Sequence, residues 1–246
     1  MHDARMNQQD KDKPSETLGG RITCLALAIF ATGLFAVGCG SHIGPTGGSM
    51  WKKTIEGSGT VAEEARPAEP IESIELRISC NVVGEVSDSA SLTITGDDNL
   101  LQYIRTQVID GKLRIDSEER LKPSSVIKVN ITSPELKGAS ISGSGKIMLN
   151  GIETPHFHAS ISGSGSIQAA GTSENVDATI SGSGNIDLLS LPSVNASASI
   201  SGSGLIQVDA KQSLNAHISG SGSIRYAGDP TVSKHISGSG SVSKTR

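Results

Sequence analysis

Four histidines are the residues of this chain whose types and spacing come nearest to a metal site. His156 and His158 lie two positions apart, and His217 and His235 each precede the isoleucine of a recurring motif. Imidazole nitrogens bind zinc when further ligands complete the coordination shell. No acidic residue recurs at a matching position, and the copies of the motif between the two pairs carry a hydroxyl residue instead. We therefore expect solvent-exposed histidines, no metal site and no cofactor.

The carboxylates that could serve acid–base chemistry are scattered. Asp177, Asp187 and Asp209 fall at different positions of successive repeats, whereas a glycosidase needs two carboxylates at a fixed separation. No serine is placed with a histidine and an aspartate in the pattern of a nucleophilic triad. The stretch SGSGKI, residues 142–147, lacks the earlier glycine and the final Ser or Thr of a phosphate-binding loop. We expect no catalytic residue.

The most regular feature of the sequence is the phrase ISGSG, which occurs six times in the C-terminal part. Successive copies are 20, 19, 20, 18 and 18 residues apart, and such a period is typical of a solenoid in which each repeat forms one coil. The apolar residues of a copy share one parity and the serines take the other, so the aliphatic side chains should point inward and the serines outward. The copies begin at Ile141, Ile161, Ile180, Ile200, Ile218 and Ile236.

Each Gly-Ser-Gly is predicted to be a sharp corner of a coil. Glycine permits a positive φ and carries no Cβ into a crowded turn, and we expect both glycines to face the interior. The serines of successive corners would then form hydroxyl ladders, which on other solenoids can bind ice or carbohydrate. The predicted corner glycines are Gly143, Gly145, Gly163, Gly165, Gly182, Gly184, Gly202, Gly204, Gly220, Gly222, Gly238 and Gly240.

The elements that must position these corners are strands. Turn-forming stretches such as NGIETP and AGTSEN separate the copies and should close the other end of each coil. Residues 51–137 predict less regular β structure, with a hairpin at Asp110-Gly111 and one or two helical turns with an acidic N-cap within residues 97–108. The predicted fold class is all-β: a β-solenoid with coils of about 18–20 residues and Gly-Ser-Gly corners over 138–246, and a less regular β N-terminal half.

The N-terminal segment predicts export. Residues 22–38 form a run of 17 uncharged residues after Arg21, which suits a signal peptide over 1–38 better than a membrane span. The run ends in AVGC, so Cys39 would be lipidated with palmitate and become the mature N-terminus, followed by a flexible tether over 39–50. An uncleaved membrane helix is the alternative. Because Gly40 rather than Asp follows the cysteine, we expect an outer-membrane lipoprotein.

Composition and single residue positions limit the kinds of ligand and assembly that we expect. The net charge is −4 and aromatic residues make up 2% of the chain, which argues against a nucleic-acid ligand. Cys80 lies in an alternating apolar row and should be a buried hydrophobic side chain rather than a reactive thiol. Lys234 falls on the inward parity of the last coil, where a charge discourages strand addition, so we expect a monomer.

The segment from Ile55 to Arg246 resembles the putative auto-transporter adhesin, head GIN domain family. The resemblance rests on IEGSGTV, on IESIELRISCNVVGEV, on SLTITGDDNLLQYIRTQVIDGKLRI and on the GSG copies from IKVNITSPELKGASISGSGKI onward. It implies a head GIN-type domain over 51–246 whose β-solenoid is similar to that of pectin lyases but lacks their catalytic residues. Cys80-Asn81 departs from the glycine-rich or Asp-containing turn that the family often has there.

The resemblance implies an exported bacterial protein and supplies no catalytic residue to carry over. We accordingly expect a non-enzymatic, lipid-anchored envelope protein that presents a rigid solenoid to a protein or carbohydrate ligand in adhesion or interaction. A carbohydrate-active β-helix enzyme and a structural or sensory envelope component without external ligand are the alternatives. The sequence does not identify the ligand or the side of the membrane that the protein faces.

Overall fold

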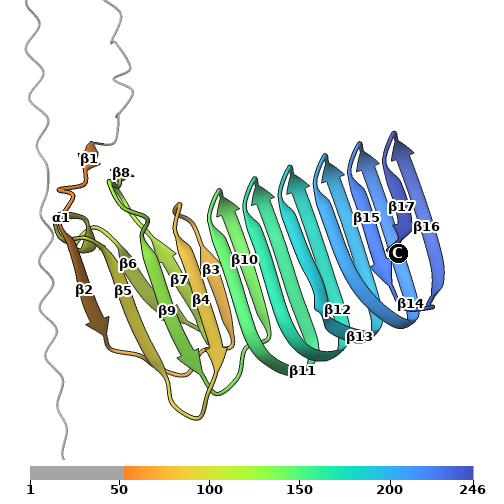
Figure 1. Ribbon diagram of the computed structural model, residues 1–246, viewed down its shortest axis with the longest axis horizontal. Helices are drawn as coiled ribbons and strands as arrows, with labels where there is room; N and C mark the ends of the chain where they lie inside the picture. Colours follow the sequence, from red (N-terminus) through yellow and green to blue (C-terminus); the bar gives the residue numbers. More distant parts are fainter. Residues whose placement is uncertain (1–52, 246) are drawn as a thin grey trace, which may run out of the picture. The chain divides into compact units, whose positions relative to one another are not determined.

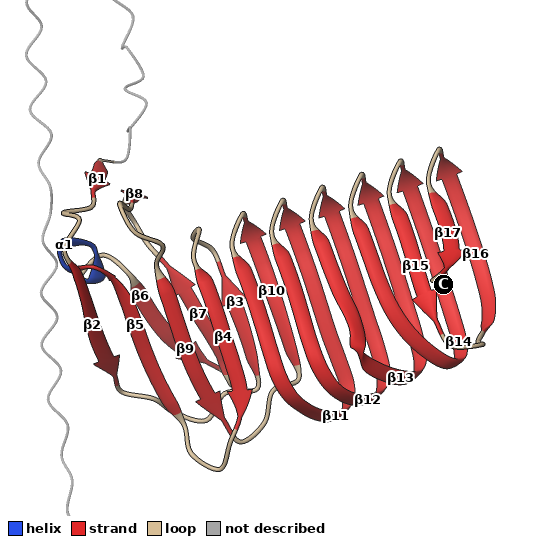
Figure 2. Cartoon of the chain, in the orientation of Figure 1, coloured by secondary structure: helices blue, strands red, loops and turns tan. Residues whose placement is uncertain are grey.

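The structure, a computed structural model, describes residues 53–245, and these form a stack of β coils (Figures 1 and 2). The predicted signal peptide, Cys39 and the predicted tether lie outside the described residues. The regular part comprises β10 (Gly138–Gly143), β11 (Lys146–Gly163), β12 (Ser166–Gly182), β13 (Asn185–Gly202), β14 (Leu205–Gly220), β15 (Ser223–Ala227), β16 (Thr231–Gly238) and β17 (Ser241–Lys244). The all-β solenoid predicted from the repeat is confirmed.

Each coil from β11 to β14 is one long strand that bends, and the last coil is divided into β15 and β16. A Gly-Ser-Gly corner joins each coil to the next. All neighbouring strands in this part are parallel, and they pair in register from corner to corner. The bend divides every coil into two faces. We call face A the half that follows a corner, such as 146–150, and face B the half that precedes the next corner, such as 156–163.

The bends differ from the turns predicted between the motif copies. From β11 to β14 the backbone stays in strand conformation through the bend, and the pairing shifts register there, for example between Leu149 and Ile152 where β11 meets β12. Only the last coil leaves strand conformation, at residues 228–230 between β15 and β16. A difference of one or two residues between neighbouring bends is absorbed by that shift. The coils can therefore vary in length while their corners remain aligned.

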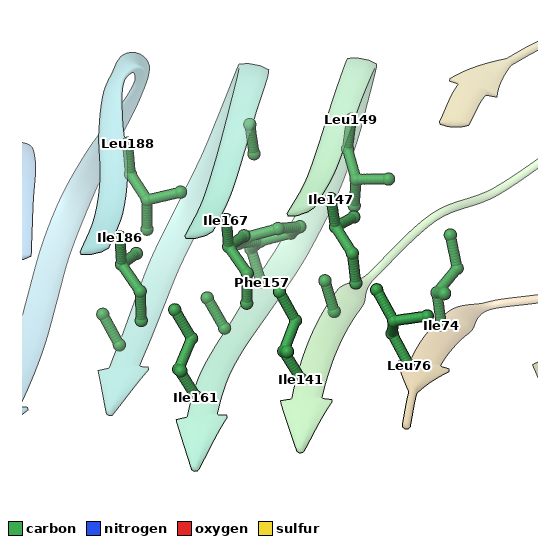
Figure 3. Packing of buried hydrophobic residues seen from close by; sticks show 14 of the residues in the cluster. Ile74, Leu76, Ile141, Ile147, Leu149, Phe157, Ile161, Ile167, Ile186 and Leu188 are labelled. Carbon is green, nitrogen blue, oxygen red and sulfur yellow. The ribbon is translucent and has the colours of Figure 1, made fainter. Parts of the chain in front are cut away.

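The interior is a set of columns in which one residue from each coil stacks on the next. Figure 3 shows the inward side chains of face A, such as Ile147 and Ile167, and those of face B, such as Ile141 and Ile161. The isoleucines of the motif are 0–2% exposed up to Ile218, which stacks on Ile200. Phe157 is the one aromatic side chain in the buried core of the described residues.

The N-terminal part belongs to the same stack, in an order that differs from the sequence. Its elements are β1 (Thr54–Glu56), β2 (Val61–Arg66), β3 (Ser73–Leu76), β4 (Asn81–Val86), β5 (Ser91–Asp97), α1 (Asp98–Leu101), β6 (Arg105–Ile109), β7 (Lys112–Asp116), β8 (Arg120–Lys122) and β9 (Lys128–Ser133). On face B, β3 lies between β7 and β10, and on face A, β4 lies between β9 and β11. The layer of β3 and β4 is thus sandwiched between two layers that follow it in the sequence.

The first layer runs in the opposite direction to the coils. β5 is antiparallel to β9, and β6 is antiparallel to β7, with α1 between β5 and β6. The hairpin predicted at Asp110-Gly111 is confirmed, with φ of 49° and 72° at the two residues. β2 adds a further antiparallel strand to β5, and β1 pairs with β8 in a separate two-stranded sheet.

The predicted helical turn is present, but its cap differs from the prediction. Asp97 occupies the N-cap position of α1 without making a side-chain capping bond. Its fully buried carboxylate instead accepts hydrogen bonds from the backbone N–H groups of Gly59, Ser124 and Ser125, at 2.9, 2.8 and 3.3 Å. Asp97 therefore ties two loops to the first layer rather than initiating a helix.

Candidate functional site: the outward surface of face B

The two glycines of a corner have different geometries. Gly202 has a φ of 129°, and a Cβ built on it would lie 2.4 Å from the carbonyl oxygen of Gly182 in the preceding coil. A Cβ on Gly204 would instead lie 2.7 Å from Cγ2 of the core residue Ile180. The prediction that both glycines face the interior is therefore corrected for the first, whose missing side chain points along the stack.

The corners also continue the hydrogen-bond ladder from coil to coil. The N–H of Ser203 donates to the carbonyl of Gly182 at 2.9 Å, and the N–H of Leu205 donates to that of Gly184 at 3.0 Å. A side chain on the first glycine would meet the acceptor of this ladder directly. The corners thus fix the register in which outward side chains of successive coils line up.

That register assembles a surface of short polar side chains on the outward side of face B, from β10 to β16, which we call the polar surface. Among its members Asp177 alone carries a formal charge when histidine is neutral. The surface presents hydroxyl, amide and imidazole groups in rows about 4.8 Å apart. Its members are Ser140, Ser142, His156, His158, Ser160, Ser162, Asn175, Asp177, Thr179, Ser181, Asn195, Ser197, Ser199, Ser201, Ser213, Asn215, His217, Ser219, Thr231, Ser233, His235 and Ser237.

Some of these rows are internally bonded. The amide nitrogen of Asn195 donates to the side-chain oxygen of Asn175 at 3.1 Å, and the hydroxyl of Ser213 donates to the oxygen of Asn195 at 2.6 Å. His217 and His235 stack with ring centroids 5.1 Å apart and planes 5° from parallel, as neighbours in register. These contacts hold side chains of adjacent coils in one repeated orientation.

The other half of face B, over β6, β7 and β3, is charged. Arg105 pairs with Asp116 at 2.8 Å. Glu75 accepts from Arg77 at 2.7 Å and from Arg114 at 3.1 Å. Burial raises the pKa of Glu75, but the two guanidinium groups outweigh it and hold the pKa below its ordinary value. Face B therefore changes from paired charges to uncharged polar groups between β3 and β10.

A groove lies at this boundary. It has a volume of about 540 Å³, and its lining comes from β3, β7, β10 and β11. Gly138 contributes no side chain to the row between Ser73 and His158. A Cβ there would be 2.7 Å from the carbonyl oxygen of His158, so the close approach of the two backbones excludes any larger residue.

The candidate catalytic and metal-binding residues are not brought together. Asp177 lies on face B, whereas Asp187 and Asp209 belong to face A at different registers, and Asp209 pairs with Lys211. Over residues 53–245, no three or more His, Cys, Asp or Glu side chains are grouped so that they could hold a metal ion. On face B, β12 and β13 separate His156 and His158 on β11 from His217 on β14 and His235 on β16, so the two histidine pairs share no site.

Cys80 is buried, as its place in the apolar row predicts, with 3% of the residue exposed. It occupies the position of the second corner glycine, because Asn81 pairs with Lys146, the residue after Gly145. Burial raises the pKa of the Cys80 thiol to about 12. The thiol is therefore protonated at neutral pH and packs as a small apolar group.

The described residues also contain no helix that is long and apolar enough to cross a membrane. The fold and the corners define a β-solenoid that presents an ordered polar surface on face B. A family model described as "Putative auto-transporter adhesin, head GIN domain" matches residues 71–230. The chain belongs to this family.

Solved structures of bacterial proteins share the fold. A putative adhesin from Bacteroides fragilis NCTC 9343 is 25% identical and has a TM-score of 0.65, over 78% of this chain and 100% of that chain. A putative lipid binding protein from Parabacteroides distasonis ATCC 8503 is 28% identical with a TM-score of 0.52, over 79% of this chain and 100% of that chain. No protein in the curated set matches the chain.

Proposed function

We propose that the protein is a non-enzymatic lipoprotein of the bacterial cell envelope that adheres to a ligand through its solenoid. The observation that carries the proposal is the polar surface of face B, where coils paired in register repeat hydroxyl and amide groups and Asp177 is the one carboxylate among its members. Membership of a family described as adhesins supports the same role. A carbohydrate polymer, which displays hydroxyl groups at regular intervals, is the ligand that this surface fits best. Hydrogen bonds from many rows would add up to useful affinity even though each contributes little.

Adhesion is tested with the full chain on bacterial cells and a panel of immobilised polysaccharides and surface proteins. We expect retention on at least one polysaccharide and a loss of retention for Ser199→Glu, which puts a carboxylate in the middle of the polar surface. Ser166→Glu is the matched control, because Ser166 points outward on face A. Retention that is equal for both variants would show that the polar surface is not the adhesive face.

The same panel separates adhesion from catalysis. Release of shorter oligosaccharides from any polymer, followed by reducing-end assay, would favour the rival function of a carbohydrate-active enzyme. We expect no release, because the carboxylates of face A and face B do not converge.

The anchor is part of the proposal and rests on the sequence, since Cys39 lies outside the described residues. We expect the cysteine to carry lipid in the outer membrane, with the solenoid as the exposed part. Cys39→Ala should abolish labelling by radioactive palmitate and release the protein from the membrane fraction. Continued labelling of this variant would contradict the lipoprotein assignment, whatever the outcome of the adhesion assay.

A further inference from the structure

The groove at Gly138 combines a floor of small residues with walls of hydrogen-bonding groups. The floor of the groove consists of small residues in neighbouring rows of face B, so little side-chain volume fills it. These residues are Ser73, Gly138, Ser140 and Ser160. Because Gly138 cannot carry a side chain without moving the backbone of His158, the hollow is a fixed feature of the fold. A groove of about 540 Å³ is within the range of pockets that hold small ligands.

The acids that line the groove already have cationic partners. Glu72 pairs with Lys137 at 3.3 Å. Glu75 is held by Arg77 and Arg114, so its oxygens are directed to guanidinium groups. Both carboxylates of the lining are thus already paired with cationic side chains of the protein.

In contrast to the two carboxylates, one lysine of the lining has no ion-pair partner among the described residues. Within residues 53–245, no carboxylate lies within ion-pair distance of the exposed Lys112, which neighbours Ser73 in register. His156 and His158 are exposed on the opposite wall, and their rings can donate hydrogen bonds. The serine and histidine side chains around the groove can therefore donate hydrogen bonds to a ligand, and Lys112 adds a positive charge that has no carboxylate partner within residues 53–245.

We propose that the Gly138 groove is a binding site for an acidic saccharide, with a uronate carboxylate beside Lys112 and sugar hydroxyls on the serines and histidines. This inference rests on the proposed function and names the ligand class of one end of the same face. The adjoining polar surface continues directly from the groove along β11 to β16, so a longer chain can extend over it.

The site is tested by calorimetry with the full-length chain in a neutral detergent. The probe is a tetramer of β-1,4-linked glucuronic acid, and its methyl ester serves as the uncharged counterpart. We expect the acid to bind, with an affinity that falls as salt is raised, and the ester to bind at least about tenfold more weakly, as for the loss of a charge-assisted hydrogen bond.

Matched variants locate the binding. Lys112→Gln should weaken the acid about tenfold, whereas Lys128→Gln, on the outward side of face A, should leave it unchanged. Ser160→Gln fills the floor and should abolish binding. Ser166→Gln, which makes the same substitution on the outward side of face A, should have no effect on the tetramer.

The outcomes separate this inference from the proposed function. Failure of the acid tetramer to bind, equal affinity for acid and ester, or full affinity in Lys112→Gln would overturn the groove site. None of these results affects adhesion to a long polymer that depends on Ser199. Conversely, tetramer binding without retention on any polymer or protein would support the groove and contradict the adhesive role of the polar surface.

Discussion

At the scale of single residues, the corner glycines are the most sharply testable feature. Gly143 and Gly202 both have a positive φ, of 131° and 129°. A Cβ on Gly143 would meet nothing within 4 Å, whereas one on Gly202 would meet the carbonyl of Gly182. Substituting the two positions therefore separates backbone strain from the clash between coils.

We expect Gly143→Ala to cost about 1–3 kcal/mol of unfolding free energy through strain alone, and Gly202→Ala to cost more. Gly202→Val should likewise be far more damaging than Ser203→Val, because Ser203 is exposed at the tip of the corner. Urea denaturation of the variants measures the differences. Equal losses at positions 202 and 203 would contradict the close packing of successive corners.

Asp97 makes the stability of the fold depend on pH. Burial raises the pKa of this carboxyl, but hydrogen bonds from the backbone N–H groups of Ser125, Ser124 and Gly59 outweigh it, and the pKa is lowered from 3.8. The ionised form is the one that the fold favours. Its stabilisation is therefore fully present above pH 3.8 and is lost as the pH falls below that value toward the lowered pKa.

Asp97→Asn should lower the melting temperature at neutral pH and flatten its decline in acid. The amide keeps the shape of the side chain but loses the charge that the three N–H groups bind. Thermal unfolding of both proteins from neutral pH to below 3.8 checks this. If the melting temperatures of the two proteins fall in parallel as the pH is lowered over that range, Asp97 does not control the acid sensitivity of the first layer.

At the scale of elements, the repeat made the regular coils predictable and the N-terminal layers much less so. Period-two alternation runs through a corner without interruption, so residues 73–86 predict strand but do not reveal the corner at 77–80. That corner lacks glycine, and in the preceding layer the longer segment 117–127 connects β7 to β9. The bends of β11 to β13 have the sequence of turns, because Gly, Asn and Pro are common to both.

The core column of Phe157 tests how closely neighbouring coils are fitted. Phe157 is 1% exposed and stacks on Val176 of the next coil. We expect Phe157→Ala to cost about 3–5 kcal/mol, and Phe157→Val, the residue type of the next coil, to cost clearly less. Chemical denaturation gives both values. If the two substitutions cost the same, the coils collapse around the gap and the column is not tightly packed.

At the scale of the whole described unit, the order of the layers could not be read from the sequence. Placing β3 and β4 between layers that come later requires strand pairing across long stretches of chain, and no local pattern encodes it. The same limit applies to the Gly138 groove. Its lining residues range from Glu72 to Ser160 and meet only because of this interleaving.

Lys234 bears on self-association. It stacks on Ala216, in an inward column that consists of buried alanines from β10 to β14, yet Lys234 itself is exposed. An inward charge on an outer strand discourages edge-to-edge pairing. We expect residues 50–246 to be monomeric in light scattering, and Lys234→Ile to form dimers or fibres. A stable oligomer of the unchanged protein would contradict this protective role.

The reversed layer of β5, α1 and β6 makes the two directions along the stack unequal. Toward that layer the chain changes direction, so no further coil can be inserted without rebuilding it. In the other direction every regular coil offers the next the same strand and the same corner. Loss or duplication of one coil, such as residues 166–184, would change the reach of the molecule by about 4.8 Å while the Gly138 groove stayed intact. Evolution can therefore adjust reach and recognition independently, in steps of one coil.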